Sequence, residues 1–270
     1  MRFFTLLPLL SFFLSSSLRA GASPSSSDLN TPSNFNSKRA SAHLSRRHGD
    51  GSLSSPHTGL SAFSRRATAK ISTYSGPLKG QATWYGNDGS GGACSLPGRS
   101  SDLKFAAFSG AKWDNSANCG ACVRVTGPNG VIDVQIIDEC PECAAGSLDL
   151  STSAFSKIAP ISRGVVPITW EFISCVSAGL EKGSVSVVWK SGSSAYWMAI
   201  QVRGAAFPVQ SIAIRAATSA TYTNLKREDY NYFSATSGMG NGPFVVLVRY
   251  QNGSKTIIKN VKLNSIVEDD

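Results

Sequence analysis

The sequence of 270 residues predicts an all-β protein of two β-sheet units that follow an extended N-terminal leader. From about Gly76 onward, short runs of alternating apolar and polar residues are punctuated by Gly, Pro and Asn, which is typical of β-strands joined by tight turns. All six cysteines lie between Cys94 and Cys175. The chain therefore divides into a first unit, 76–178, stabilised by disulfides, and a cysteine-free second unit, 184–270.

The first 22 residues combine basic Arg2, an apolar run and a small-residue Ala-Gly-Ala site, which together are typical of a cleaved secretory signal. The apolar run is shorter than the roughly 20 residues that span a bilayer, so we expect a secreted, extracellular protein without a membrane anchor. Residues 23–75 are rich in Ser, Asn and Pro and are predicted to be a disordered pro-segment or linker. Their dibasic pairs are candidate processing sites or, equally, solvated charges: Lys38-Arg39, Arg46-Arg47 and Arg65-Arg66.

In the first unit, strands are expected in the runs GQATWYG, CVRVTGPNG, VIDVQIID and VPITWEFISC, with GPNG as a hairpin turn. The segment LDLSTSAFSKIA predicts one short helix with Ser151 as its N-cap and with Phe155 and Ile158 buried. About a hundred residues of this kind, crossed by disulfides, are typical of a small closed β-barrel.

The second unit follows the short connector SAGLEKG, which favours a defined arrangement over free movement. Its regularly spaced strand-like runs predict a β-sandwich: SVSVVWK, YWMAIQVRG, VQSIAIRAA, YNYFSA, PFVVLVRY and KTIIKNVKL. Trp189 is expected in core or interdomain packing. QNGS is interpreted first as a hairpin turn, although Asn252 in it also begins an N-glycosylation sequon.

Charge and histidine content exclude several function classes. Residues 1–75 contain nine basic and two acidic residues, so they hold +7 of the formal net charge of +9. The nearly neutral remainder argues against a nucleic-acid partner, because such proteins cluster basic charge on the folded domain. All three histidines, His43, His48 and His57, precede residue 76. The folded part therefore lacks serine–histidine and cysteine–histidine catalysis and histidine-containing metal sites.

The even number of cysteines in a protein expected to be exported predicts three structural disulfides, with fifteen pairings open from the sequence alone. The two Cys-x-x-Cys pairs would also suit zinc or redox chemistry. An oxidising destination argues against zinc, and no thioredoxin-like βαβ pattern supports redox chemistry.

We expect a monomer with no metal and no cofactor.

The motifs GQATWYG, CGACVRVTGPNG, IID, GSLDLSTSAF, SSAYWMAIQVR and EDYNYF, in this order, resemble an expansin of the microbial type, for which we expect a fungal source. The resemblance runs from about Gly80 to the C-terminus. It implies a six-stranded double-psi β-barrel followed by an immunoglobulin-like β-sandwich that is a carbohydrate-binding module. It also implies a secreted protein that binds cellulose and matrix polysaccharides and loosens plant cell walls without hydrolysis.

The resemblance further implies the site residues of the barrel. Thr83, Asp138 and Asp149 match positions that line the groove of microbial expansins, and Asp149 matches the indispensable one. Cys140 stands where bacterial relatives have a tyrosine, so an aromatic wall is expected from Trp84 or Tyr85. The implied disulfides are Cys94–Cys119, Cys122–Cys175 and Cys140–Cys143.

In the second unit, the positions that match the cellulose-stacking aromatic row of expansins are Tyr196, Trp197 and Tyr230. Flat apolar rings suit the C–H faces of glucosyl units. Neighbours on a regular strand point to opposite faces, so Tyr196 and Trp197 share a platform only at a bulge or a strand end. The alternative places Tyr196 in the sandwich core beside Met198 and Ile200.

The chemistry of the two aspartates has two interpretations. A carboxyl that protonates or hydrogen-bonds a glycosidic oxygen needs a raised pKa, which burial beside another carboxylate would give Asp149. Alternatively, Asp149 only faces the N-terminus of the helix after Ser151, and Asp138 only ends a strand.

Hydrolysis requires a second carboxylate roughly 6.5 to 9.5 Å from the acid. Expansin barrels resemble family 45 glycoside hydrolases, whose base position aligns here with Asn87, an amide that cannot accept the proton; Asp88 is its neighbour. We therefore expect a non-hydrolytic protein. The alternatives are a weak family 45-like endoglucanase and a barwin-like lectin that binds chitin or peptidoglycan, with a lytic transglycosylase as a remote option.

Overall fold

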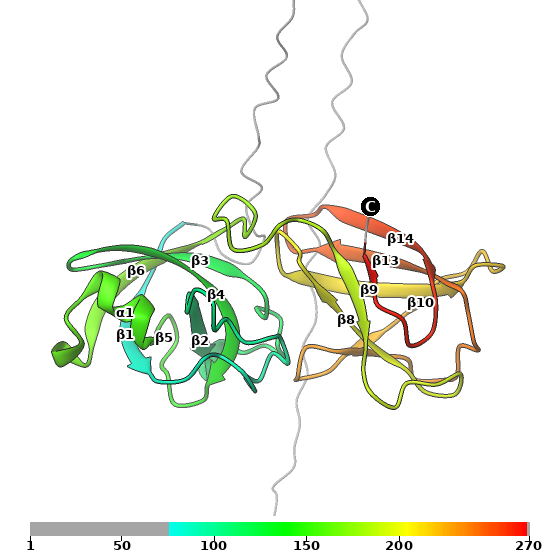
Figure 1. Cartoon of the computed structure of the whole chain (residues 1–270), viewed down its shortest axis with the longest axis horizontal. Coiled ribbons are helices and arrows are strands. Elements are labelled where there is room, and N and C mark those ends of the chain that lie inside the picture. The colour runs from blue at the N-terminus through cyan, green and yellow to red at the C-terminus, as the bar shows by residue number, and fades with distance from the viewer. Residues whose placement is uncertain (1–75, 269–270) are drawn as a thin grey trace, which may run out of the picture. The chain divides into compact units, whose positions relative to one another are not determined.

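The computed structural model describes residues 76–268, which form a closed β-barrel followed by two further β-sheets (Figure 1). The predicted signal peptide and pro-segment lie outside the described residues. Neighbouring strands of the barrel follow the order β1-β5-β2-β4-β3-β6. Their bounds are β1 Leu78–Tyr85, β2 Phe105–Ser109, β3 Cys122–Gly127, β4 Gly130–Cys140, β5 Leu148–Ser151 and β6 Val166–Ile173.

The second part consists of a four-stranded sheet, β10-β9-β13-β14, and a five-stranded sheet, β11-β12-β8-β7-β15. Its strands are β7 Ser186–Trp189, β8 Ala199–Arg203, β9 Val209–Ala216, β10 Thr223–Asn224, β11 Lys226–Arg227, β12 Phe233–Ser234, β13 Phe244–Tyr250, β14 Lys255–Val261 and β15 Val267–Glu268. The predicted all-β class, a barrel followed by a sandwich, is confirmed. None of the described helices is long and apolar enough to cross a membrane.

The barrel interior is filled by apolar side chains that alternate along the strands with outward-facing ones. Ala82, Leu148 and Leu150 are fully buried in this core, and Thr83 and Asp149 alternate with them along the chain. Helix α1, Thr152–Ile158, buries Phe155 and Ile158 against the same core, as predicted. The hairpin turn predicted at GPNG is present, since residues 127 and 130 are paired across β3 and β4.

Two barrel strands were not predicted. The run FAAFS of β2 is buried at every position, so it shows no alternation. The four residues of β5 lead directly into α1 and were assigned to the helix segment. In the sandwich, Trp189 packs on the core, with its ring centroid 5.8 Å from that of Phe244, which agrees with the predicted packing role.

Three disulfides join distant and local parts of the barrel, and they are the pairs that the resemblance implied. Cys122–Cys175 links the start of β3 to the segment after β6, and Cys94–Cys119 links the loops that flank β2. Cys140–Cys143 closes a loop of four residues at the end of β4. No described cysteine is free.

Replacing Ser151 by alanine should destabilise the barrel. The buried Ser151 hydroxyl accepts a hydrogen bond from the amide of Ala154 at 3.1 Å and donates one to the carbonyl of Leu103. Ser151→Ala removes both bonds, so we expect the free energy of unfolding to fall by about 1–2 kcal/mol. Urea denaturation with intact disulfides measures it. Ser156→Ala, which removes only an exposed contact to Ser153, should change it by less than about 0.5 kcal/mol; equal losses would contradict the capping role.

Candidate functional site

One row of residues crosses four neighbouring barrel strands and brings the predicted groove residues together. The parallel pairing of β1 with β5 sets Thr83 opposite Asp149. Ala107 of β2 lies opposite Asp149 on one side and opposite Asp138 of β4 on the other. Because neighbouring strands lie about 4.8 Å apart, the backbones of the two aspartates are separated by roughly 10 Å. Ala107 itself is buried between them.

Asp149 is half-buried and is oriented by a side-chain hydrogen bond. The hydroxyl of Thr83 donates to Asp149 Oδ1 at 2.5 Å. Burial raises the pKa of the Asp149 carboxyl above its ordinary value of 3.8, the Thr83 bond opposes this rise, and the charges of Glu142 and Asp138 add to it. Proton retention is the property that the acid interpretation requires. Asp149 precedes Ser151 by two residues, and the helix N-cap is filled by Ser151 itself.

Asp138 is committed to backbone contacts. Its Oδ1 accepts hydrogen bonds from the amides of Ala93 at 2.7 Å and Glu139 at 2.8 Å. These bonds anchor the loop before Cys94 to the end of β4. The Asp138 carboxylate therefore holds this loop in place, and its charge adds to the rise in the pKa of Asp149.

A groove on the barrel surface contains Asp149. Its lining residues are Gln81, Thr83, Trp84, Cys140, Glu142, Cys143, Ala144, Ser147 and Asp149. Trp84 is 38% exposed, and its indole N–H donates to the carbonyl of Ile161 at 3.3 Å, which fixes the ring at the groove. Tyr85 is not in this lining. It packs edge-on against Phe105, and burial raises the pKa of its hydroxyl, with a further rise from the nearby charges of Asp138 and Asp149.

Glu142 is a groove residue that the sequence analysis missed. It lies between Cys140 and Cys143 and is exposed to solvent. Burial raises the pKa of Asp149 most, and the charges of Glu142 and Asp138 both add to this rise. The disulfide-closed loop next to Asp138 was the signal in the sequence, because such a short ring presents its middle residues outward.

The residues aligned with the hydrolase base do not reach the groove. Asn87 Oδ1 accepts from the amide of Gly89 at 2.8 Å. The Asp88 carboxylate accepts from the amide and the hydroxyl of Ser90 at 2.9 and 2.6 Å, and these bonds lower its pKa. Both side chains thus stabilise a turn, and neither belongs to the groove lining.

In the sandwich, Tyr196 and Trp197 lie in a tight turn just before β8, where strand alternation does not apply. Tyr196 is 88% exposed and Trp197 is 40% exposed. The hydroxyl oxygen of Ser194 accepts from both of their amides at 3.3 Å. The alternative that buries Tyr196 in the core is wrong, although Met198 and Ile200 are buried there.

Tyr230 is half-buried just before β12, a neighbour of β8 in the same sheet. Its ring centroid lies 5.9 Å from that of Tyr232. The ammonium group of Lys190, just after β7, lies 5.0 Å from the Tyr230 ring and 5.2 Å from the Tyr232 ring. Lys190 was not predicted from the sequence, because it comes close to Tyr230 only when β7, β8 and β12 are paired.

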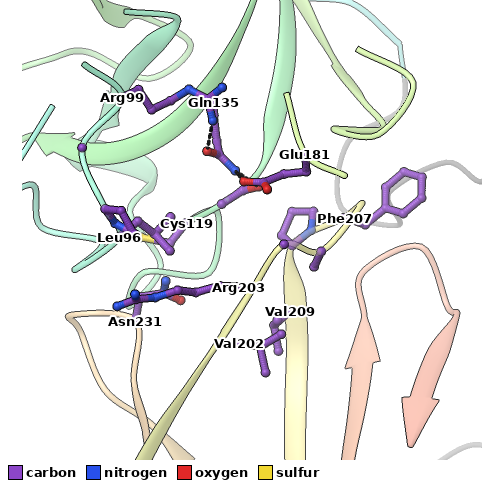
Figure 2. Close-up of a pocket in the computed structure, with 16 residues that line it drawn as sticks. Leu96, Arg99, Cys119, Gln135, Glu181, Val202, Arg203, Phe207, Val209 and Asn231 are labelled. Carbon is purple, nitrogen blue, oxygen red and sulfur yellow. Dashed lines mark hydrogen bonds between the residues drawn. The ribbon is translucent and has the colours of Figure 1, made fainter. Parts of the chain in front are cut away.

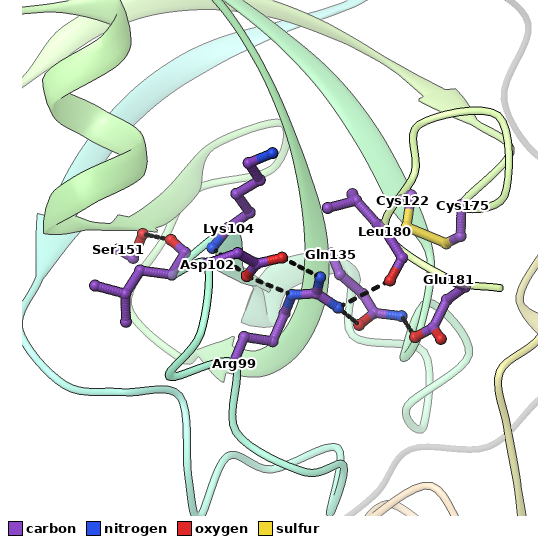
Figure 3. Close-up of polar contacts among 10 residues, drawn as sticks. Arg99, Asp102, Lys104, Cys122, Gln135, Ser151, Cys175, Leu180 and Glu181 are labelled. Carbon is purple, nitrogen blue, oxygen red and sulfur yellow. Dashed lines mark hydrogen bonds and ion pairs between the residues drawn. A yellow bond between two sulfur atoms is a disulfide. The ribbon is translucent and has the colours of Figure 1, made fainter.

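A second hollow is lined by both the barrel and the sandwich, from Leu96 and Arg99 to Arg203 and Asn231 (Figure 2). Several of its polar groups are paired with one another. Arg99 donates to Gln135 at 2.8 Å, and the Gln135 amide donates to Glu181 at 2.8 Å. Arg99 also forms a two-point ion pair with Asp102 and donates to the carbonyl of Leu180 (Figure 3). This network fastens the connector to the barrel, so we interpret it as structural.

Within the described residues, no group of three or more His, Cys, Asp or Glu side chains is arranged to hold a metal ion.

Comparison with known proteins places this geometry in a family. The family model described as lytic transglycolase matches residues 78–170, which is the barrel. Expansin-YoaJ of Bacillus subtilis is 34% identical over 188 residues, 68% of this chain and 77% of that protein. Expansin-like protein 1 of Dictyostelium discoideum is 28% identical over 200 residues, 70% of this chain and 68% of that protein.

Among solved structures, a mutant expansin of Clavibacter michiganensis in complex with cellohexaose matches with a TM-score of 0.64 and 30% identity, covering 70% of this chain and 94% of that one. These matches extend beyond the barrel into the sandwich, whereas the lytic transglycolase model does not. The fungal source stays a prediction. The chain belongs to the expansin family.

Proposed function

We propose that this expansin is a secreted, non-hydrolytic protein that anchors itself to cellulose through the sandwich and engages a second glycan chain in the barrel groove. The observation that carries the proposal is the Thr83–Asp149 hydrogen bond inside an open groove beside Trp84. A carboxyl that is oriented and holds its proton can donate a hydrogen bond to a glycan oxygen. The similar Clavibacter expansin in complex with cellohexaose supports a β-glucan as one partner.

The groove loosens a wall contact by exchange of hydrogen bonds. A glucan chain that stacks a C–H face on Trp84 presents its oxygens to Asp149 and to neighbouring polar groups. Each hydrogen bond made to the protein replaces one between two polysaccharides. No covalent bond breaks, so the effect is mechanical.

The sandwich supplies the anchor. Tyr196 and Trp197 offer exposed rings, while Lys190 beside Tyr230 offers a donor for sugar hydroxyls at the ring edge. All of these residues lie in segments next to β7, β8 and β12, which are neighbouring strands of one sheet. Secretion is supported by the three disulfides, which persist in oxidising compartments.

One observation favours a second candidate function, a weak endoglucanase. Glu142 lines the groove together with Asp149, and an inverting glycosidase uses two carboxyl groups roughly 6.5 to 9.5 Å apart, one as acid and one as base. Glu142 is exposed to solvent, whereas Asp149 is half-buried and oriented by Thr83. Release of reducing sugar from amorphous glucan, lost in both Asp149→Asn and Glu142→Gln, would establish this function instead.

Removing the exposed rings should weaken cellulose binding. Tyr196→Ala deletes one stacked ring, and we expect a loss of about 1 kcal/mol, or roughly fivefold in Kd, with more than about tenfold for the double variant with Trp197→Ala. Depletion from solution by microcrystalline cellulose measures the affinity. Tyr222→Ala is the matched control, because Tyr222 lies under Arg215 and outside the proposed platform. A double variant that binds like the control would contradict the proposal.

Asp149→Asn should separate loosening from binding. The amide keeps the shape of the side chain and can accept the Thr83 bond, but it has no acidic proton. We expect wall creep to fall by more than about tenfold while cellulose binding is unchanged. A creep assay run beside a reducing-sugar assay tests both parts, and neither protein should release sugar. Equal creep in the variant would overturn the role of Asp149.

The raised pKa of Asp149 also predicts a pH-dependent effect on stability. The folded state holds this proton more tightly than the unfolded state, so stability contributed by Asp149 is lost as the pH rises from 3.8 through the raised value. Asp149→Asn removes that loss. We expect the variant to be more stable than the parent at pH 7 and the difference to shrink towards pH 3.5. Urea denaturation across this range measures it; a variant that is less stable at pH 7 would contradict the raised pKa.

A further inference from the structure

The loop that carries Glu142 is held rigidly at the end of β4. The Cys140–Cys143 disulfide closes it, and the amide of Cys143 donates to the carbonyl of Cys140 at 3.1 Å. The hydroxyl of Ser109 donates to the carbonyl of Cys143 at 2.7 Å. Pro141 removes further backbone freedom.

The same loop is packed directly on the backbone of the neighbouring strand end. A Cβ added to Gly110 would lie 2.7 Å from the Cα of Pro141, a distance that backbone atoms do not tolerate. The absence of a side chain at Gly110 thus permits this close approach. The position of Glu142 relative to the groove is therefore fixed by covalent closure, a hydrogen bond and close packing together.

The groove at this place is acidic. Glu142 and Asp149 are its acidic lining residues, and the described lining contains no lysine or arginine. Burial raises the pKa of Asp149 most, and the negative charge of Glu142 raises it further. A ligand in the groove is exposed to the same negative field, with no positive lining group to offset it.

We propose that Glu142 is a specificity-determining residue that makes the barrel groove accept neutral glycans and reject glycans that carry carboxylates. This inference rests on the proposed function, since it assumes that a glycan occupies the groove. A glucan chain carries no charge and pays no electrostatic penalty beside Glu142. A polyuronate carries a carboxylate on each sugar unit, and the negative charge of Glu142 repels these carboxylates.

The effect should be measurable but limited, because Glu142 is exposed to water and its field is screened by salt. We expect removal of its charge to change selectivity by about three- to tenfold at low ionic strength and by much less in 0.5 M salt, where the Debye length is only a few ångströms.

The test reads the groove directly through the indole N–H of Trp84. The full chain is labelled with ¹⁵N, and the Trp84 signal is assigned among the five tryptophans with Trp84→Phe. Cellohexaose and a hexamer of galacturonic acid are titrated separately at pH 6.5 into the parent protein, into E142Q and into Glu171→Gln. Glu171 is exposed on β6 and outside the groove lining, so its variant loses the same charge elsewhere.

We expect the parent to bind cellohexaose at Trp84 more tightly than the uronate hexamer. E142Q should reduce the ratio of the two Kd values, uronate hexamer over cellohexaose, about three- to tenfold at low salt. Glu171→Gln should leave this ratio unchanged. An unchanged Kd ratio in E142Q, or an equal decrease of the ratio in both variants, overturns the inference but leaves the proposed function standing. A Trp84 signal that cellohexaose does not move overturns the groove as a glycan site and the inference with it.

Discussion

The hydrogen bond between Thr83 and Asp149 depends on the parallel pairing of β1 with β5, and the groove depends on that bond. A closed barrel of six strands is needed to bring these two segments, 66 residues apart in sequence, side by side. Burial in the barrel wall raises the pKa of Asp149, while Thr83 limits the rise and orients the carboxyl. A helix beginning at Thr152 and capped by Ser151 holds β5 in register beneath it. Local structure, packing and protonation are thus linked through one pair of side chains.

The two parts of the described chain are also joined where the binding residues lie. The three backbone carbonyls before Tyr230 accept hydrogen bonds from barrel side chains: Trp113 to Asp229, Ser116 to Glu228 and Asn115 to Arg227. The buried amide of Gln201 donates to the carbonyl of Cys94 at 3.0 Å. Polar bonds of this kind fix orientation more than they add stability. The segment that carries Tyr230 therefore takes its shape partly from the barrel.

The alternating strands, the capped helix and the GPNG turn were predictable because each depends on residues close in sequence. Strand β2 was missed because a run buried on both faces shows no alternation, and β5 because it is short and merges with α1. The positions of Thr83 and Asp149 were predicted from the family resemblance, but the commitment of Asp138 to the amides of Ala93 and Glu139 was not. Glu142 and Lys190 were missed because their roles arise from a disulfide ring and from strand pairing.

Asp149 is proposed as a groove acid whose pKa lies above the ordinary value of an aspartate. Carbon-detected NMR titration of the side-chain carboxyl, with Asp149→Asn used to assign the resonance, measures this pKa in the folded protein. We expect a titration midpoint above 3.8, the ordinary value for aspartate. A midpoint at or below 3.8 would show that the Thr83 bond outweighs burial, and it would contradict the proposed role of Asp149.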